Sequence, residues 1–256
     1  MLSILVNIFH YLGRSRFPTA VSMFSPASFI RAEPGIYGLI ILNQPILSKL
    51  FLFRRLWKMV IASVRVAADG GGNRLYETFE EKERLEFIPE YIVGDLDSLK
   101  QEVQEWYQAQ GTQVKEHEDQ DLTDFDKSLL QIDEAISKTC DVVVLSGNGG
   151  RTDQVFANIN ILYRHQRRIF LITEESITFV VRKGSSVILT PCRIFGKTCG
   201  LIPTGKPSII STTGLKWNLD QMHSEFGGMV STSNVIVEEE VTVNCTEDIL
   251  WTMELR

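Results

Sequence analysis

Short apolar runs alternate with helix-length amphipathic segments from Ile36 to about residue 182 of this 256-residue chain. Six runs have the length and apolar character of strands: Tyr37–Leu42, Val64–Ala68, Glu90–Val93, Thr112–His117, Val142–Leu145 and Arg168–Thr173. Repeated strand–helix units are typical of a mostly parallel sheet with helices on both faces. The alternation therefore predicts an α/β domain over residues 36–182.

Four segments between these runs are expected to be helices. Ile46–Met59 is strongly apolar, and a second helix carries Val155, Ile159 and Leu162 on one face. Ser98–Gln101 has the form of a capping box and predicts a helix that begins there. Another helix is expected to start near Thr123, because its apolar residues recur at helical spacing: Phe125, Leu129, Ile132 and Ile136.

The pattern changes after Lys183. Short runs such as Ser186–Leu189, Ile209–Thr212 and Val241–Val243 are separated by turns rich in Gly, Pro and Thr. The last run alternates strictly, as in a strand with one buried face: Ile249, Trp251, Met253 and Leu255. We therefore expect a second, all-β sandwich domain over residues 183–256.

Residues 1–35 have a different composition. Met1–Leu12 is apolar but lacks a basic leader and is too short to span a bilayer. Three arginines and several serines precede the first acidic residue, Glu33: Arg14, Arg16 and Arg31. This composition resembles a mitochondrial transit segment; the alternatives are a disordered extension or a true start at Met23. No other stretch approaches a membrane span, so we expect a cytoplasmic protein, with mitochondrial targeting as the alternative.

Charge and cysteine usage exclude several classes of function. The net charge of −6 argues against a broad nucleic-acid-binding surface. The four cysteines form no C-x-x-C pair, which argues against a zinc site or a small disulfide scaffold: Cys140, Cys192, Cys199 and Cys245. We expect reduced thiols in an intracellular protein.

Acidic and glycine-rich turns follow four of the predicted strands: Asp69–Arg74, Gly94–Ser98, Asp119–Asp124 and Ser146–Gln154. In a parallel sheet such turns share the edge at the carboxyl ends of the strands, where ligands bind. Two carboxylates about 4 Å apart repel by about 4 kcal/mol at an effective dielectric of about 20, so their convergence calls for a cation. Oxygen ligands without a nearby cysteine favour Mg²⁺ or Mn²⁺ over zinc.

Each of these turns also has a simpler interpretation. Asp95-Leu96-Asp97 alone fits a solvated turn with a helix cap, and only the second acidic turn favours a metal site. Gly70–Gly72 fits a tight strand–helix turn, or a close approach to phosphate at a helix N-terminus. Two common phosphate motifs fail, because Pro191 and Thr152 stand where a P-loop and a dinucleotide fingerprint require glycine. Any nucleotide must therefore be held in another way.

Two segments of the second half could form a ligand site. Trp217 is either a core residue or an aromatic face that stacks a flat, positively charged heterocycle. Ser231–Asn234 is a run of small hydrogen-bonding residues.

Six ordered motifs between Tyr37 and Met253 resemble those of eukaryotic thiamine pyrophosphokinases. The motifs begin at Asp69 (DGGGNRLY), Gly94 (GDLDS), Asp119 (DQDLTDF), Gly150 (GRTDQ), Gly214 (GLKWNL) and Val230 (VSTSN). The resemblance implies a homodimer whose subunits combine an α/β catalytic domain with a β-sandwich domain. One departure is Ser146, where the family has glycine; serine fits there if its φ is negative.

The resemblance also implies roles for individual residues. Magnesium and the ATP phosphates would be held by Asp95, Asp97, Asp121 and Asp124. The nucleotide region would be lined by Asp69, Asn73, Arg74, Gln120, Arg151, Asp153 and Gln154. Thiamine would contact Trp217, Ser231, Thr232, Ser233 and Asn234, with the dimer partner completing the pocket. Asp97 or Asp121 would accept the hydroxyl proton, and Arg151 would stabilise the transferring group.

The reaction implied is transfer of a diphosphate from ATP to the hydroxyethyl group of thiamine, which gives thiamine diphosphate and AMP. Two alternatives remain open at this point. One is a magnesium-dependent phosphohydrolase in which Asp95 or Asp97 is the nucleophile. The other is a thiamine- or nucleotide-binding protein without catalytic activity.

Overall fold

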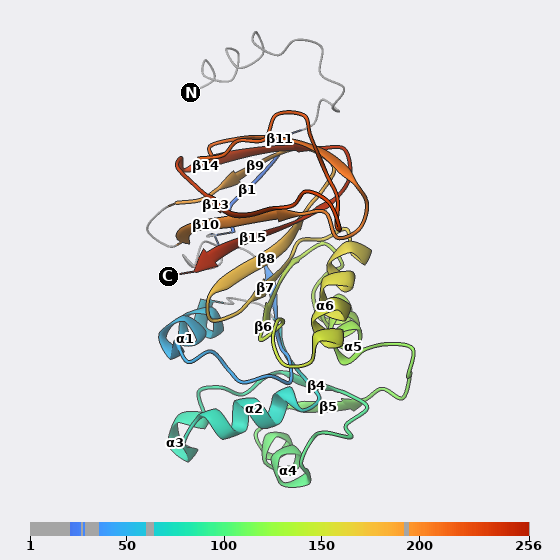
Figure 1. Ribbon diagram of the computed structural model, residues 1–256. Coiled ribbons are helices and arrows are strands. Elements are labelled where there is room, and N and C mark those ends of the chain that lie inside the picture. The colour runs from blue at the N-terminus through green and yellow to red at the C-terminus, as the bar shows by residue number, and fades with distance from the viewer. Residues whose placement is uncertain (1–20, 27, 29–35, 60–63, 192–194, 256) are drawn as a thin grey trace.

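The computed structural model describes residues 21–26, 28, 36–59, 64–191 and 195–255, and Figure 1 labels their elements. The apolar run Met1–Leu12, the arginines that follow it and Cys192 lie outside the described residues. Within them, strands form one sheet of ten and a second sheet of five.

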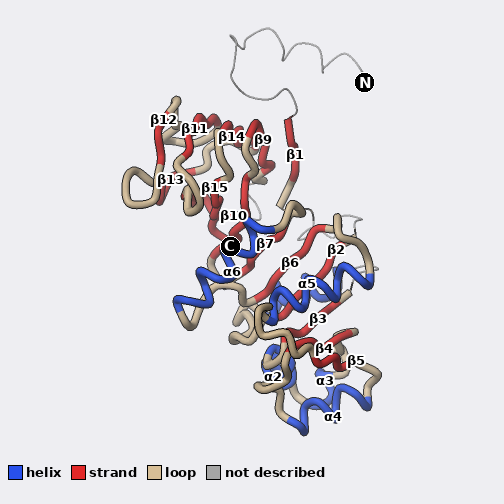
Figure 2. Tube along the Cα trace, turned by 90° about the vertical axis from the view of Figure 1, so that its right-hand side faces the viewer, coloured by secondary structure: helices blue, strands red, loops and turns tan. Residues whose placement is uncertain are grey.

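One half of the ten-stranded sheet is parallel. Its strands are β2 (Tyr37–Ile41), β3 (Arg65–Ala68), β4 (Tyr91–Gly94), β5 (Gln113–Glu116), β6 (Asp141–Leu145) and β7 (Ile169–Ile172). They correspond to the six predicted runs and lie in the order β7-β6-β2-β3-β4-β5, with every neighbouring pair parallel. The chain enters at β2 and builds outward in both directions, so the strand order reverses between β2 and β6 (Figure 2).

Helices cover both faces of this parallel half (Figure 1). The helices are α1 (Leu50–Met59), α2 (Gly71–Thr78), α3 (Glu81–Arg84), α4 (Gln101–Ala109), α5 (Asp124–Ala135) and α6 (Thr152–Arg164). Successive strand residues point to opposite faces, so Leu39 and Ile41 pack with α1, α2 and α4, whereas Ile40 packs with α5 and α6. The two apolar cores hold the strand ends in place.

The other half of the large sheet belongs to a sandwich. Here β8 (Ser176–Val181), β10 (Phe195–Ile202), β13 (Ser231–Val235) and β15 (Ile249–Leu255) continue the sheet in antiparallel pairing. The second sheet has the order β1 (Val21–Phe24), β9 (Gly184–Leu189), β14 (Glu240–Cys245), β11 (Ser208–Thr213) and β12 (Met222–Ser224). Phe179 and Trp251 of the first sheet share one core with Ile188 and Val243 of the second.

The predicted boundary at residue 182 lies just after β8. Because β8 pairs with β7 on one side and β15 on the other, hydrogen bonding runs without a break from the α/β half into the sandwich. Both faces of β8 are covered, since Ile177, Thr178 and Phe179 are all buried. The two halves are therefore two ends of one sheet.

The capping box expected at Ser98–Gln101 is absent. Helix α4 begins at Gln101, and its N-cap residue, Lys100, makes no side-chain cap. The turn is held instead by Asn73, whose amide donates to Ser98 O (2.7 Å) and accepts from Lys100 N (3.0 Å). The predicted start near Thr123 is confirmed: Thr123 caps α5 and its hydroxyl accepts from Asp126 N (3.2 Å).

Part of the segment expected to be disordered or targeting is an ordered strand. Val21–Phe24 forms β1, which pairs in parallel with β9 at the edge of the five-stranded sheet. The Phe24 ring meets Phe179 edge-on at 5.4 Å, and the Arg168 guanidinium lies 5.4 Å from its centroid. The interpretation of residues 1–35 as one unstructured extension is therefore wrong for residues 21–24.

Two further features concern compartment. None of the helices in the described part of the chain is long and apolar enough to cross a membrane. In the same part, Cys140, Cys199 and Cys245 are buried free thiols.

Replacing Phe24 with alanine is expected to lower the free energy of unfolding by about 1–2 kcal/mol, because the ring is half-buried and contributes two aromatic contacts. Chemical denaturation of the purified chain measures the loss. Met23→Ala is the matched control, since the Met23 side chain on the same strand is 62% exposed. Equal effects of the two substitutions would contradict a packing role for β1.

Candidate functional site

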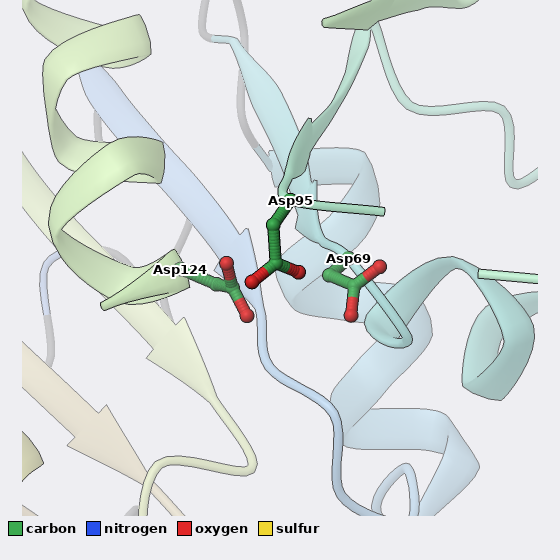
Figure 3. Close-up of side chains that lie close together, drawn as sticks. All are labelled: Asp69, Asp95 and Asp124. Atoms are coloured by element: carbon green, nitrogen blue, oxygen red, sulfur yellow. The ribbon is translucent and has the colours of Figure 1, made fainter. Parts of the chain in front are cut away.

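Three carboxylates from separate segments meet at the carboxyl edge of the parallel strands. Asp69 follows β3, Asp95 follows β4, and Asp124 is the first residue of α5. One oxygen of each lies within 4.8 Å of the others (Figure 3). The segments converge because parallel strands end at one edge and the helix that returns across the sheet starts from that edge. The convergence predicted for the acidic turns is thus confirmed for Asp95 and Asp124.

The backbone fixes this proximity. Asp69 has a φ of 42°, and its N–H donates to Val93 O at 2.9 Å. At Gly94 a Cβ atom would lie 2.6 Å from the Asp69 Cβ and 3.2 Å from Asp124 Oδ1, so only glycine allows β4 to approach so closely. The close approach of β4 to Asp69 therefore places the backbones that carry Asp69 and Asp95 side by side.

Of the three carboxylates, Asp69 is buried, whereas Asp95 and Asp124 are partly exposed. Asp69 Oδ2 accepts from Ser98 N (3.2 Å), and its Oδ1 is buried without a partner among the described residues. Burial raises the pKa of Asp69, and the charge of Asp124 raises it further. Burial likewise raises the pKa of Asp124; Lys127 opposes this rise and Asp95 adds to it.

Sequence reasoning missed Lys127. This side chain is only 2% exposed, and its Nζ lies 3.4 Å from Asp124 Oδ1 and 3.9 Å from Asp95 Oδ2. The sequence did contain one indication of this contact. Lys127 is three residues after Asp124, and residues i and i+3 share a helix face.

The donor set fits a hard divalent cation. All three side chains offer oxygen, the grouping includes no cysteine or histidine, and the buried Asp69 Oδ1 lacks a hydrogen-bond partner. Mg²⁺ prefers such oxygen ligands, whereas zinc prefers nitrogen and sulfur. Asp69, which sequence reasoning assigned to the nucleotide, belongs with the candidate metal ligands.

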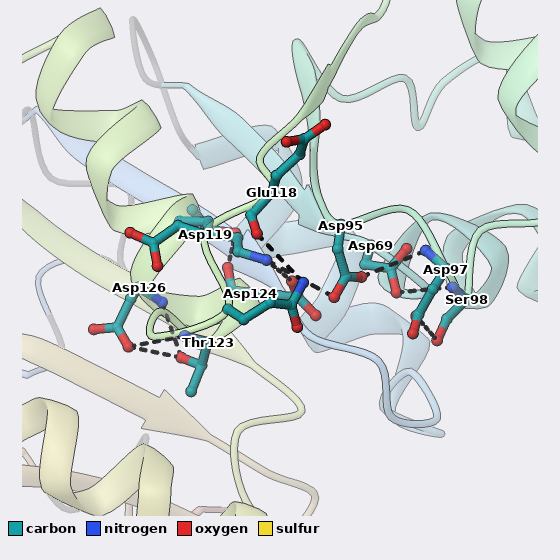
Figure 4. A network of polar contacts seen from close by, with 12 residues as sticks. Asp69, Asp95, Asp97, Ser98, Glu118, Asp119, Thr123, Asp124 and Asp126 are labelled. Carbon is teal, nitrogen blue, oxygen red and sulfur yellow. Dashed lines mark hydrogen bonds and ion pairs between the residues drawn. The ribbon is translucent and has the colours of Figure 1, made fainter.

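Asp97, Gln120 and Asp121 are exposed. Asp97 lies in the turn after β4, close to Asp95 and Asp69 (Figure 4), and Gln120 and Asp121 belong to the turn between β5 and α5. The Asp97 carboxylate accepts from its neighbour Ser98 Oγ (2.9 Å), while Asp121 N donates to Asp119 Oδ1 (2.9 Å). The carboxylates of Asp97 and Asp121 are not members of the group of three.

The basic and amide residues predicted for the nucleotide region occupy two places. Asn73 is buried and engaged with the turn before α4, and Arg74 Nε donates to Asn43 Oδ1 (3.0 Å) just beyond β2. Arg151, Asp153 and Gln154 are exposed at the start of α6. Arg151 and Asp153 form an ion pair there, with Nη2 and Oδ2 2.5 Å apart.

A cavity of about 1080 Å³ opens where the strand order reverses. Its wall includes residues that follow β2 and β6 and residues of the sandwich: Gln44, Ser146, Asn148, Gly150, Thr232 and Ser233. Asn148 Oδ1 is buried here without a partner in the described part of the chain. The condition stated for serine at position 146, a negative φ, is not met: its φ is 63°, and its hydroxyl donates to Pro45 O at 2.9 Å.

The residues predicted to contact thiamine are neighbours. Asn234 is buried; its amide accepts from Trp217 N (3.3 Å) and donates to Trp217 O (2.8 Å) and Ser231 Oγ (3.2 Å). Trp217 itself is 54% exposed, so its interpretation as a core residue is wrong. Lys216 Nζ lies 4.5 Å from the centroid of its ring.

Comparison with known proteins agrees with this arrangement. A family model described as "Thiamin pyrophosphokinase, catalytic domain" matches residues 53–173, and one described as "Thiamin pyrophosphokinase, vitamin B1 binding domain" matches residues 185–250. Thiamine pyrophosphokinase 3 of Oryza sativa subsp. japonica is 41% identical over 86% of this chain and 87% of its own length. The chain belongs to the thiamine pyrophosphokinase family.

Other members of the thiamine pyrophosphokinase family support the assignment. Thiamine pyrophosphokinase 1 of Arabidopsis thaliana is 36% identical over 86% of both chains. The solved structure of the enzyme from Candida albicans is 29% identical, covers 96% of each chain and has a TM-score of 0.81. The yeast structure is 26% identical, covers 96% of this chain and 94% of its own, and has a TM-score of 0.82. The resemblance drawn from the six motifs is confirmed.

Asp69→Asn is expected to flatten the pH dependence of stability in the metal-free protein. Because the folded-state pKa of Asp69 lies above its ordinary value of 3.8, its contribution to stability is present below that value and is lost as the pH rises through the folded-state pKa. The melting midpoint in EDTA should therefore fall less in the variant than in the wild type between about pH 4 and about pH 7.

Asp153→Asn is the control for this measurement. Arg151 lowers the pKa of the exposed Asp153, so this contribution has the opposite sign and is lost as the pH falls. If the melting midpoint of Asp69→Asn depends on pH as the wild-type midpoint does, the buried Asp69 carboxylate does not lower stability as the pH rises.

Proposed function

We propose that this chain transfers a diphosphate from ATP to the hydroxyethyl oxygen of thiamine and releases AMP and thiamine diphosphate. The observation that carries the proposal is the convergence of Asp69, Asp95 and Asp124 at the carboxyl edge, with a buried Asp69 oxygen left unpaired. Family membership supplies the substrate class, and this arrangement of carboxylates supplies a place for a metal-bound polyphosphate.

Asp69, Asp95 and Asp124 would hold Mg²⁺, which when bound neutralises phosphate charge and polarises the reacting phosphorus. The chain's own contribution is mainly positioning, since diphosphate transfer needs little covalent chemistry from the protein. Asp97 and Asp121 are exposed and are our candidates for an additional metal contact or for accepting the hydroxyl proton.

Arg151 is the proposed cation for the transferring group. It is paired with Asp153, and both side chains are well exposed. Exposed ion pairs contribute only about 0–1 kcal/mol, so little opposes its transfer from Asp153 to a phosphate oxygen. Arg74 would supply a second forked donor nearer the carboxylates.

ATP is proposed to place its nucleoside in the cavity at the strand-order reversal. The cavity wall offers the unpaired acceptor Asn148 Oδ1 to a base N–H, and its glycine-rich turn leaves space for close approach. Gln44 lies against Gly150, and the next residue back, Asn43, lies against Gly70. These two side chains form a continuous edge from the cavity toward Asp69. A triphosphate along this edge would reach the candidate metal ligands.

Thiamine is proposed to stack on Trp217 in a homodimer. The exposed ring already has a lysine ammonium above its face, and the thiazolium ring is also a cation that such a face attracts. Other large apolar side chains of the sandwich are exposed as well: Met222, Phe226, Met229 and Val237. A second copy covering them would bring its own carboxyl edge to the stacked thiamine.

A cytoplasmic location remains our prediction.

The alternatives are not favoured. A phosphohydrolase would use one aspartate of Asp95-Leu96-Asp97 as its nucleophile, but it would leave the match to the thiamine pyrophosphokinase family unexplained. A protein that only binds its ligands gains nothing from the repulsion among Asp69, Asp95 and Asp124. Incubation with ATP, Mg²⁺ and thiamine separates the three functions: AMP with thiamine diphosphate supports our proposal, free phosphate supports hydrolysis, and binding without products supports the non-catalytic role.

Asp95→Asn and Asp124→Asn are each expected to lower kcat by about 100-fold or more, because each removes a ligand that stabilises charge in the transition state. AMP and thiamine diphosphate are quantified by chromatography. Asp119→Asn is the control, since this exposed residue lies outside the group of three. Wild-type turnover in both ligand variants would contradict the proposal, and Asp121→Asn measured alongside them tests the role left to Asp121.

Asn148→Ala is expected to raise KM for ATP about tenfold and to leave KM for thiamine unchanged, because it removes a buried acceptor proposed to meet the base. Initial rates with each substrate varied in turn measure both constants. Asn160→Ala, an exposed substitution on α6, is the control. A change in KM for thiamine alone would show that the cavity takes thiamine instead.

A further inference from the structure

Lys127 is a buried cation on the protein side of the acidic group. Its side chain is 2% exposed, whereas those of Asp95 and Asp124 are 27% and 36% exposed. Its ion pairs within the described residues are with these two carboxylates. Because both carboxylates are far better exposed than Lys127, a ligand arriving from solvent meets them first. Lys127 therefore acts on the site through Asp95 and Asp124.

The charges of this group are nearly balanced for one divalent ion. Asp69, Asp95 and Asp124 together carry three negative charges when ionised, and Lys127 reduces the total to two. A buried lysine is otherwise costly and is usually retained only with paired partners. Here its partners come from different segments, the turn after β4 and the start of α5, so one ammonium draws the two carboxylates toward the same space.

We propose that Lys127 is a positioning residue that sets the spacing and net charge of the pair Asp95 and Asp124 for a divalent cation. The inference rests on the proposed function, because it takes this group as the metal site. It assigns Lys127 no contact with substrate. The inference predicts two separate effects of the Lys127 ammonium. It lowers the affinity for the metal by repulsion, and it raises kcat by holding the two carboxylates in place.

Lys127→Met tests these two effects, since methionine keeps an unbranched stem and removes the charge. Mn²⁺ affinity of the purified full-length chain is measured from the electron paramagnetic resonance signal of free Mn²⁺. We expect about tenfold tighter Mn²⁺ binding, because a positive charge close to the ion is gone. At saturating Mg²⁺ we expect kcat to fall about tenfold or more, with KM for ATP little changed. Unchanged or weaker Mn²⁺ binding would overturn the inference.

Arg167→Met is the matched control. Arg167 is also buried and forms an ion pair with Asp133, near the opposite end of the same helix α5. Its replacement removes a buried cation that is paired with α5, without touching the acidic group. It should lower the melting midpoint and leave Mn²⁺ affinity at the wild-type value. Tighter Mn²⁺ binding in this variant as well would show that the effect is not specific to Lys127.

A double variant covers the case in which Lys127→Met folds but is strongly destabilised. Asp124→Asn with Lys127→Met removes one charge of each sign, so its melting midpoint in EDTA should recover at least half of what Lys127→Met loses. No recovery would mean that Lys127 is needed for packing alone, which overturns the inference. The wild type separates the two proposals: if it binds no Mn²⁺, the metal site of the proposed function fails, whatever the variants do.

Discussion

Mutual repulsion among three carboxylates is the constraint around which this fold is built at its carboxyl edge. Asp69 and Asp95 follow adjacent parallel strands, and Gly94 brings those strands together too closely for any side chain at that position. Asp124 is held from the other side, because Phe125 and Leu129 anchor α5 in the core beneath it. Like charges about 4 Å apart cost about 4 kcal/mol at an intermediate dielectric. The apolar cores on both faces of the sheet hold the segments that bring one oxygen of each carboxylate within 4.8 Å of the others, so the free energy of folding offsets their repulsion.

The continuity of the large sheet gives the sandwich a part in the cavity at the strand-order reversal. The apolar core beneath α1, α2 and α4 continues along one face of the large sheet into the space between the two sheets, where Phe179 and Trp251 lie. The cavity sits at this junction, with walls from the turns after β2 and β6 and from β10, β13 and β15. A separate β domain on a linker could not hold such walls at a fixed distance. The uninterrupted pairing from β7 through β8 to β15 does so, and it therefore couples the two halves mechanically.

Much of this arrangement could be predicted from the sequence because it depends on local periodicity. The apolar runs at β2 and β6 and the helical spacing of apolar residues after Thr123 predicted their elements. The position of Asp95 and Asp124 in turns that follow strands predicted their meeting. Features that depend on a third partner could not be predicted. Asn73 replaces the capping box at Ser98, although it lies 25 residues earlier. From the sequence alone, Lys127 resembles a solvent-facing helix residue. Its burial and its contact with Asp95 depend on where β4 ends. The continuity of the sheet depends on β15, which is the last strand of the chain.

Backbone strain is concentrated at the same edge. The described residues include five non-glycine residues with a positive φ: Asp69, Leu96, Ser146, Gln221 and Ser233. Three of them follow strands of the parallel half, and Ser233 lines the cavity. A left-handed conformation costs a non-glycine residue about 1–2 kcal/mol, and glycine would avoid that cost. At Asp69 glycine would remove a carboxylate, and at Ser146 it would remove the hydrogen bond to Pro45. At these two positions the side chain supplies a group that glycine would lack, and the regular packing behind them offsets the backbone cost.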